Sequence, residues 1–344
     1  MSARQRGAAI VALVGAGAAG AIAGGSRRSG PGLGATGVLG LLGAWTVGRR
    51  AASALVDAAG PTSDEGRADG SQRARACGEG TGCGGAALVV LIPARDEAVV
   101  LPHVVGDLAR QAHRVPDGTR GFDVVVVDDG SIDGSGEVAL AAAARLGASE
   151  AVSVVRVDGG TKGAALASAT AELKLAGDRL RAFVVLDADA RVPPGFMCAA
   201  SRLAVEHEAA TVRRRTLHAS ADSLAATQDD EQTLDGALQA LRSAGGGAPE
   251  LRGNGMIVRA TALDRAGGWR SGVLTEDLEL SMRLVLSGTR VAWTGEAALW
   301  EDAAPTLGAF ARQRMRWAEG SVRRLLEVDP RSTLAAPVPI VARL

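Results

Sequence analysis

The sequence has little aromatic character: phenylalanine, tryptophan and tyrosine together make up 3% of its 344 residues, and tyrosine is absent. Proteins that bind single-stranded nucleic acid usually stack bases on aromatic side chains, so this scarcity argues against that function. The formal net charge at pH 7 is zero, which leaves no basic excess to attract a phosphate backbone. We therefore expect no nucleic-acid partner.

Cysteine is also scarce, with only Cys77, Cys83 and Cys198. An odd number with one distant member is not the framework of a disulfide-stabilised secreted domain. Cys77 and Cys83 lie in a glycine-rich stretch with no histidine nearby, so a zinc site there would lack ligands. We expect these cysteines to be free thiols.

Lysine and asparagine are almost missing. Lys162 and Lys174 are the only lysines in a chain rich in arginine, and Asn254 is the only asparagine. A lysine or asparagine that is present despite this bias suggests a position where arginine or aspartate could not replace it, although chance is the simpler explanation.

Two long stretches near the N-terminus, residues 7–26 and 29–48, carry no charged side chain. Each is about long enough to cross the hydrocarbon core of a membrane, and their small residues would let two helices pack closely. Arginines flank both ends of each stretch, so positive charge does not fix an orientation. We expect residues 1–50 to form two transmembrane segments that anchor a cytosolic domain.

A cleaved signal peptide is the alternative for the first stretch. Arg4 and Arg6 would be its basic start, and Ala21-Ile22-Ala23 its cleavage site. This alternative would place the domain outside the cytosol, and the second uncharged stretch fits it poorly. Residues 51–86 lack periodicity and are predicted to form a flexible linker.

From residue 88 onward, short apolar runs alternate with helical periodicity. Strands are predicted at 88–93, 122–127, 152–157 and 183–186, and helices at 97–112, 137–146 and 162–175. Continuous apolar strands that alternate with helices indicate an α/β fold, with a mainly parallel sheet covered by helices. Such sheets bind ligands beyond the carboxyl ends of their strands.

The second half of the chain is less regular. We predict a long helix at 220–243, a core segment at 253–258, an amphipathic helix at 276–286 and a long basic helix at 306–328.

Acidic residues end two of the predicted strands. Asp128 and Asp129 begin the run Asp128-Asp129-Gly130-Ser131, and Asp187 and Asp189 follow the fourth strand. In an extended segment Asp187 and Asp189 point to the same side, and paired carboxylates suit a hard cation such as Mg²⁺ or Mn²⁺. A turn with helix capping is the alternative for the first pair, but two acid pairs at one sheet edge favour a binding site.

Three further segments carry polar groups at helix starts or on a helix face. Lys162 begins a helix, against the helix dipole, which makes sense if an anion lies nearby. Thr275-Glu276-Asp277 precedes a helix, where helix capping is the alternative role. Gln313, Arg316 and Trp317 share one helix face, and an amphipathic helix on a membrane surface is the alternative there.

In this order the motifs resemble the signature of family 2 inverting glycosyltransferases, the branch with cellulose, chitin and poly-N-acetylglucosamine synthases. The motifs are Asp128-Asp129-Gly130, Asp187-Ala188-Asp189, Thr275-Glu276-Asp277 and Gln313-x-x-Arg316-Trp317. The resemblance covers roughly residues 88–328 and implies a nucleotide-diphosphosugar transferase (GT-A type) domain over 87–328.

The resemblance also implies a role for each matching residue. The nucleotide sugar would be bound by Pro93, Arg95, Glu97, Asp128, Asp129, Lys162 and Asp187. Asp187 and Asp189 would hold Mg²⁺ or Mn²⁺, and Asp277 would be the general base, with Glu276 and Arg316 completing the catalytic set. The acceptor would contact Asn254, Gln313 and Trp317.

The implied activity is transfer of a sugar from a nucleotide diphosphosugar, UDP-linked by preference, to a hydroxyl of a glycan or lipid at a membrane, with a β-linked product. A catalytically inactive nucleotide-sugar-binding membrane scaffold is the alternative. No Gly-x-Gly-x-x-Gly follows the first strand, which argues against a dinucleotide-dependent oxidoreductase.

One departure from the family concerns the C-terminus. Polymer synthases of this branch usually carry several membrane spans after the Gln-x-x-Arg-Trp helix, whereas only residues 329–344 follow here. This tail could begin a truncated membrane segment. A fragment, a separate channel or membrane subunit and single-sugar addition all remain open.

Overall fold

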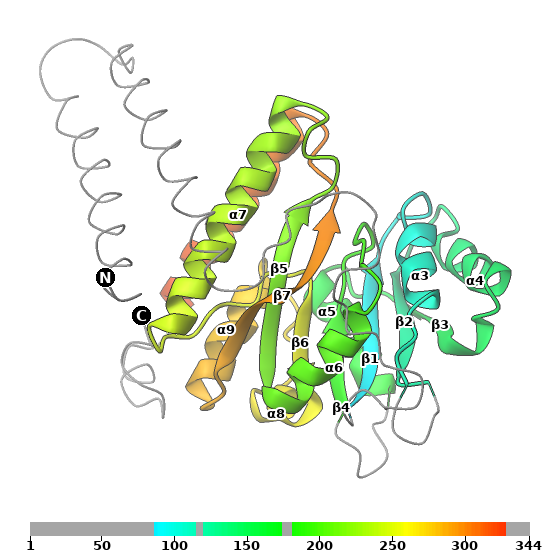
Figure 1. Cartoon of the computed structure of the whole chain (residues 1–344), viewed down its shortest axis with the longest axis horizontal. Helices are drawn as coiled ribbons and strands as arrows, with labels where there is room; N and C mark the ends of the chain where they lie inside the picture. Colours follow the sequence, from blue (N-terminus) through cyan, green and yellow to red (C-terminus); the bar gives the residue numbers. More distant parts are fainter. Residues whose placement is uncertain (1–85, 115–119, 174–180, 328–344) are drawn as a thin grey trace, which may run out of the picture.

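The computed structural model describes residues 86–114, 120–173 and 181–327, which form one seven-stranded sheet with helices on both faces (Figure 1). The first half alternates strand and helix: β1 (Ala87–Ala94), α3 (Leu101–Ala109), β2 (Phe122–Asp129), α4 (Ser135–Arg145), the short 3₁₀ helix η1 (Ser149–Ala151), β3 (Val152–Val157), α5 (Lys162–Glu172) and β4 (Arg181–Val185). The second half contains α6 (Phe196–Glu206), β5 (Ala209–Thr216), α7 (Ser223–Ala244), β6 (Met256–Arg259), α8 (Ala260–Arg265), α9 (Glu276–Leu286), β7 (Val291–Glu301) and α10 (Leu307–Glu327).

The strand order is β3-β2-β1-β4-β6-β5-β7. Strands β1 to β4 are parallel to one another, β6 is antiparallel to both β4 and β5, and β7 is parallel to β5. The sheet is therefore mostly parallel, and the predicted α/β class is confirmed.

Alternation along the strands creates two hydrophobic cores. In β1, the side chains of Leu88, Val90 and Ile92 pack with α3, α4 and α6, whereas Val89 and Leu91 pack with α5, α8 and α9 on the other face. Both faces of the central strands are buried, which explains why their sequences are continuously apolar.

One edge of the sheet collects polar residues from several strands. The carboxyl ends of β1, β2, β4 and β7 point to this edge, and the antiparallel β6 begins there, since Met256 pairs with Val185 at the end of β4. The loop before β6, residues 253–255, is therefore brought beside the residues that follow β4.

Helix caps fix two of the long elements locally. The Thr161 hydroxyl accepts a hydrogen bond from the Ala164 amide at the start of α5, and the Asp222 carboxylate accepts one from the Ala225 amide at the start of α7. Such caps satisfy amide groups that have no partner within the helix.

Most predicted elements are confirmed, with small shifts. The first helix begins at Leu101 rather than at residue 97, and β2 includes both Asp128 and Asp129. The prediction that Asp187 and Asp189 alternate along an extended segment is wrong, because β4 ends at Val185 and the Ala190 amide closes a turn onto the Asp187 carbonyl at 3.0 Å. Four elements of the second half were not predicted: α6, β5, α8 and β7.

Several predictions fall on residues outside the described ranges: the two membrane segments in 1–50, nearly all of the linker at 51–86, the tail at 329–344, and Cys77 and Cys83. Among the helices that the structure describes, none combines the length and apolar character needed to cross a bilayer. Cys198 is buried in α6 and takes part in a disulfide bond, so the prediction of a free thiol is wrong for this residue.

The packing around Gly255 predicts a large stability cost for a single methyl group. Gly255 has φ +73°, and an added Cβ would lie 2.5 Å from Val212 Cγ2 and 2.6 Å from Leu299 Cδ2. We expect Gly255→Ala to lower the free energy of unfolding by about 3 kcal/mol, through both overpacking and backbone strain. Urea unfolding monitored by circular dichroism measures the difference.

Gly246→Ala is the matched control, because Gly246 has φ +79° with no atom within 4 Å of an added Cβ. It should show the backbone cost alone, about 1 kcal/mol. Equal losses in the two variants would contradict the packing argument.

Candidate functional site

The ammonium group of Lys162 lies among oxygen atoms from three other segments. Its Nζ is 2.5 Å from Asp187 Oδ1, donates to the Gly253 carbonyl oxygen at 2.8 Å and is 3.4 Å from Glu276 Oε1. The start of α5, the turn after β4, the loop before β6 and the start of α9 therefore meet at one cation. The structure brings together Lys162, Asp187 and Glu276, three of the predicted site residues.

Electrostatics keep Lys162 charged. Partial burial lowers the pKa of Lys162, but the negative charges of Asp187 and Glu276 outweigh burial and raise the pKa above its usual value. The same carboxylates offset the unfavourable position of a cation at a helix N-terminus.

Two glycines allow the close approach around this cation. Gly253 has φ +74°, and a Cβ there would lie 3.4 Å from Asp277 Oδ2 and 3.7 Å from Lys162 Nζ. A Cβ on Gly163 would lie only 2.3 Å from the Arg270 carbonyl oxygen. Without side chains at these positions, α5 and the loop before β6 can both pack against the region of α9.

Asp189 lies in an unfavourable environment for a carboxylate. Burial, followed by the charges of Asp187 and Glu301, raises the pKa of Asp189 to about 7. Its Oδ2 accepts one hydrogen bond, from the Asp302 amide at 3.3 Å. We call Asp187, Asp189, Glu276, Asp277 and Glu301 the acid cluster. Within it, Lys162 pairs with Asp187 and Glu276, and Arg214 pairs with Glu301.

Asp277 is half-buried in the first turn of α9, where acids are favourable to the helix dipole. Burial and the charge of Glu276 raise the pKa of Asp277 to about 6, with Lys162 acting in the opposite direction. A carboxylate with a raised pKa is better able to accept a proton near neutral pH.

Asn254 and Glu301 support the acid cluster. Asn254 is buried, its Oδ1 accepts from the Asp187 amide at 3.1 Å, and its Nδ2 donates to Glu301 Oε2 at 3.1 Å. Burial raises the pKa of Glu301, although Arg214 opposes this. Glu301 was not predicted, but the sequence holds a signal for it: Glu301 and Asp302 come directly after the short uncharged run at 297–300.

Asp128 and Asp129 are occupied by contacts within the protein. Asp128 is fully buried, and its carboxylate accepts from the Ser131 amide at 2.9 Å and from Arg156 at 2.9 and 3.1 Å. Burial raises the pKa of Asp128, but these donors lower it further, so the net shift is downward. The Asp129 carboxylate accepts from the amides of residues 159 and 160 at 2.6 and 3.0 Å.

The loop after β1 is tied to the loop after β2. The Glu97 amide donates to Ser135 Oγ at 2.8 Å, and Arg95 Nη1 lies 3.8 Å from Asp129 Oδ2. Burial, then the charge of Asp187, raises the pKa of Glu97, which brings Glu97 into the electrostatic range of the acid cluster. Pro93 is half-buried near the end of β1.

The predicted residues of α10 make their contacts, as far as the described residues show, with neighbours other than the acid cluster. Arg314 pairs with Glu231 of α7, and its guanidinium lies 4.1 Å from the ring centre of Trp317. Gln313 accepts from Arg314 at 2.5 Å. Arg316 is exposed, and within the described residues no hydrogen bond or ion pair joins it to the acid cluster.

Two contacts nevertheless hold α10 against the domain, one at the residue before α9 and one in the loop after α7. A Cβ on Gly320 would lie 2.3 Å from Thr275 Cγ2, so α10 packs directly on the residue before Glu276. Arg324 Nη1 is 2.7 Å from Glu250 Oε1. Burial raises the pKa of Glu250, but Arg252, Arg242 and Arg324 outweigh it and lower the pKa to about 2.

The candidate ligands for a divalent cation are Asp187 and Asp189. Among the described residues, no three histidine, cysteine, aspartate or glutamate side chains are arranged to hold a metal ion. Asp187 and Asp189 offer two carboxylates, and Mg²⁺ is commonly bound by one or two carboxylates together with substrate phosphates. The residues therefore fit a cation that binds jointly with a diphosphate.

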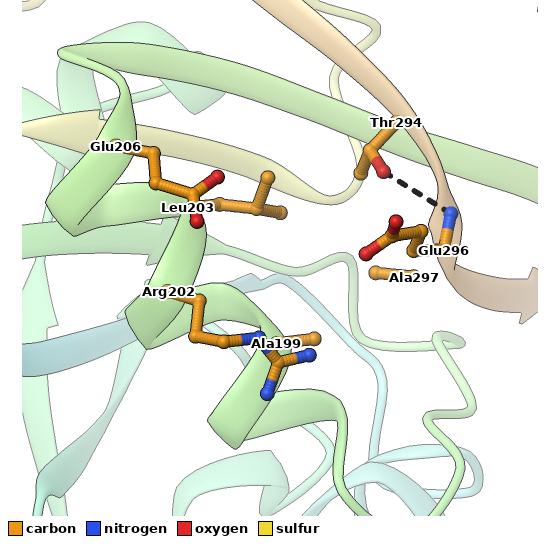
Figure 2. Close-up of a pocket in the computed structure, with 7 residues that line it drawn as sticks. All are labelled: Ala199, Arg202, Leu203, Glu206, Thr294, Glu296 and Ala297. Carbon is orange, nitrogen blue, oxygen red and sulfur yellow. Dashed lines mark hydrogen bonds between the residues drawn. The ribbon is translucent and has the colours of Figure 1, made fainter. Parts of the chain in front are cut away.

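A small hollow lies elsewhere, between α6 and an irregularity in β7 (Figure 2). Its lining consists of Ala199, Arg202, Leu203, Glu206, Thr294, Glu296 and Ala297. None of the predicted site residues lines it.

Comparison with known proteins gives a family and a fold. Residues 86–320 match the family described as Glycosyltransferase like family 2. The beta-monoglucosyldiacylglycerol synthase of Nostoc sp. is 30% identical over 240 residues, which cover 69% of this chain and 49% of that protein. The poly-beta-1,6-N-acetyl-D-glucosamine synthase of Staphylococcus aureus is 30% identical over 94 residues, 27% of this chain and 23% of that protein.

Among solved structures, the mannosyltransferase PcManGT of Pyrobaculum calidifontis, in complex with GDP-Man and Mn²⁺, has a TM-score of 0.57 at 20% identity and covers 88% of this chain and 76% of that one. This likeness shows the fold, which is α/β and GT-A-like. The match covers 49% of the glucosyldiacylglycerol synthases of Nostoc sp. and Trichormus variabilis, so the chain spans about half the length of each.

The raised pKa of Asp189 predicts a pH-dependent gain in stability on substitution. The pKa is about 7 in the folded protein against 3.8 for the unperturbed group, so the folded state keeps this proton longer and loses stability as pH rises between these values. Asp189→Asn should stabilise the ligand-free protein by about 2 kcal/mol at roughly pH 8, and by progressively less toward pH 4. Thermal unfolding at several pH values measures this.

Asp264→Asn is the control, since Asp264 is an exposed aspartate on α8 with no hydrogen bond to Asp189 in the described part of the chain. It should change stability little at any pH. A gain for Asp189→Asn that did not depend on pH would contradict the assigned environment.

Proposed function

The chain belongs to glycosyltransferase family 2 and is a glycosyltransferase, and we propose that it transfers a sugar from a nucleotide diphosphosugar, preferably UDP-linked, to an acceptor hydroxyl with inversion at the anomeric carbon. The observation that carries this proposal is the position of Lys162. Its ammonium joins Asp187, on the proposed donor side, to Glu276, beside the proposed base Asp277.

The donor side is formed by Asp187, Asp189 and Lys162. A Mg²⁺ or Mn²⁺ ion bound by the two aspartates would neutralise charge on the diphosphate, and the Mn²⁺ complex of the Pyrobaculum enzyme is the precedent. The raised pKa of Asp189 supports this assignment, because a carboxylate with little compensating charge is relieved by a cation. Lys162 lies beside Asp187 and would add positive charge for the leaving group.

The nucleoside would lie over the loops after β1, β2 and β3, near Pro93, Arg95, Glu97, Asp128 and Asp129. Asp128 and Asp129 are satisfied by protein donors in the described residues. We therefore assign them the task of shaping these loops, with Arg95 and Glu97 nearer to the ligand.

Asp277 is the proposed general base. It takes the proton of the acceptor hydroxyl as that oxygen forms a bond to the anomeric carbon, while the bond from this carbon to the diphosphate oxygen breaks. One displacement inverts the configuration, so an α-linked donor gives a β-linked product. Glu276 contributes through its charge, which raises the pKa of Asp277.

The acceptor would be a glycan or a lipid, bound near Asn254 and the α10 residues Gln313 and Trp317, with Arg316 available to a ligand because it is exposed. The synthase relatives, one named for glucosyldiacylglycerol and one for poly-N-acetylglucosamine, support both acceptor classes. The choice between them belongs to experiment.

A membrane location is part of the proposal. One side of α10 exposes Leu307, Met315 and Val322 at 70%, 71% and 56% of their surface. The exposed arginines of the same helix are Arg312, Arg316 and Arg323. Apolar residues next to basic ones suit the surface of an anionic bilayer, with the catalytic domain in the cytosol. The uncharged stretches in residues 1–50 would supply the anchor, and a separate membrane subunit would be needed only for export of a polymer.

A donor screen tests the proposed function. Membranes containing the full chain are given UDP-glucose, UDP-N-acetylglucosamine, UDP-galactose or GDP-mannose, with diacylglycerol or oligosaccharide acceptors, and release of the nucleoside diphosphate is measured. We expect release from at least one UDP-sugar that requires Mg²⁺ or Mn²⁺. Undiminished release in excess chelator would contradict the metal, and no release from any donor would favour the inactive scaffold.

The assignment of Asp277 predicts a loss of turnover with donor binding retained. Asp277→Asn should lower kcat by roughly 10²–10⁴-fold, the usual range for a positioned base, and leave UDP affinity nearly unchanged. In the unsubstituted enzyme, kcat should rise with pH through about 6, because the base works only when ionised. Steady-state kinetics across pH provide both measurements.

Asp264→Asn is the control. Asp264 is an exposed aspartate on α8, so its substitution should leave kcat unchanged. Near-normal turnover of Asp277→Asn at neutral pH would remove the base assignment and leave Asp277 as an acid that stabilises the start of α9.

A further inference from the structure

The only asparagine of the chain bridges a backbone amide and a carboxylate. Asn254 accepts from the Asp187 amide through Oδ1 and donates to Glu301 Oε2 through Nδ2, both at 3.1 Å. Its side chain is 1% exposed, so neither hydrogen bond is replaced by water.

The two hydrogen bonds of Asn254 explain why this position holds asparagine, although the rest of the sequence has none. The position needs an acceptor and a donor on the same short, planar group, which asparagine provides. Aspartate would place a second carboxylate against Glu301, and lysine or arginine would offer the Asp187 amide no acceptor.

Glu301 is itself held firmly. Its Oε1 accepts from Gln232 Nε2 at 2.5 Å and lies 3.4 Å from Arg214 Nη1. Because Oε1 already accepts from these donors of α7 and β5, Oε2 is the oxygen that accepts from Asn254 Nδ2. This contact orients the Asn254 side-chain amide, so that its Oδ1 faces the Asp187 amide. The next residue, Asp302, donates its amide to Asp189 Oδ2 at 3.3 Å.

We propose that Glu301 is a positioning residue for the donor site: through the amide of Asn254 it fixes the turn at 187–190, and so places Asp187 and Asp189 for the cation and diphosphate. The end of β7 then supports both aspartates, one through Asn254 and one through the Asp302 amide. This inference rests on the proposed donor role of the two aspartates. Glu301 acts through Asn254 and does not bind the cation itself.

The test uses a pair of substitutions that exchange an amide and a carboxylate. In Glu301→Gln the single remaining oxygen cannot serve both Asn254 and the donors Gln232 and Arg214. In Asn254→Asp two carboxylates face each other. In the double variant, the new carboxylate at position 254 accepts from the Asp187 amide and from the new side-chain amide at position 301. The oxygen of that amide remains available to Gln232 and Arg214, and the net charge returns to that of the unsubstituted protein.

Two readouts are measured on all four full-length proteins. Hydrogen exchange of the ligand-free protein reports the protection of residues 187–190, and calorimetry reports the affinity for UDP in the presence of Mn²⁺. We expect each single variant to lose protection there and to bind UDP with Mn²⁺ roughly 10–100-fold more weakly, as is usual when the support of a metal ligand is removed. The double variant should recover most of the protection at residues 187–190 and most of the affinity for UDP with Mn²⁺.

The kinetic signature separates positioning from general stability. Glu301→Gln should raise the KM for the donor and the Mn²⁺ concentration for half-maximal rate more than it raises the KM for the acceptor. Glu296→Gln, an exposed glutamate on the irregular part of β7 (Figure 2), is the matched control and should change neither.

Several outcomes would overturn the proposal. Unchanged UDP affinity in Glu301→Gln would do so, as would a double variant no better than the worse single variant. Loss of Mn²⁺ binding in all three variants with full protection at 187–190 would make Glu301 a direct ligand instead. If Glu301→Gln fails to fold, the proposal is judged from Asn254→Asp and the double variant alone: the double variant must bind UDP more tightly than Asn254→Asp.

The test also separates this proposal from the proposed function. If hydrogen exchange changes as expected but the unsubstituted protein binds no UDP, the proposed function is wrong, whereas the positioning of residues 187–190 by Glu301 is supported.

Discussion

The ammonium of Lys162 is the interaction on which the rest of the site depends. It joins the turn after β4, the loop before β6 and the start of α9, three segments that are far apart in the sequence. Each segment brings negative charge or a carbonyl oxygen toward the same place, so without a cation their approach would be repulsive. Gly163 and Gly253 remove the steric obstacles to this approach, and Lys162 removes the electrostatic one.

Four of the acids differ in their partners. Asp128 and Glu250 pair with arginines, and their pKa values are lowered despite burial. Asp189 and Asp277 pair with no arginine among the described residues, and their pKa values are raised to about 7 and about 6. The first group organises loops and helices, whereas the second is held ready for a cation or a proton, as expected of functional carboxylates.

Much of this arrangement could be predicted from local sequence. Apolar runs that end in acids gave the parallel strands and the edge where Asp187 and Asp189 lie, and the rarity of lysine and asparagine pointed to Lys162 and Asn254, which both belong to the site. The turn at Asp187 was missed because a strand end cannot be located from apolar residues alone.

The remaining features depend on contacts between distant segments. The contacts of Asp128 with Arg156 and of Asn254 with Glu301 both join segments that are distant in the sequence, so no local pattern predicts them. Strands β5 and β7 were not predicted because their partly exposed faces carry arginine, glutamate and tryptophan, which blur the apolar pattern.

The central claim, that one ammonium serves both halves of the site, is tested most directly by the pH dependence of kcat and the donor KM in Lys162→Gln. The charge of Lys162 lowers the pKa of Asp277, so its removal should move the kinetic pKa above about 6. The same substitution should raise the donor KM, because Asp187 loses its partner. A higher donor KM with an unchanged kinetic pKa would show that Lys162 serves the donor side alone and would contradict the account.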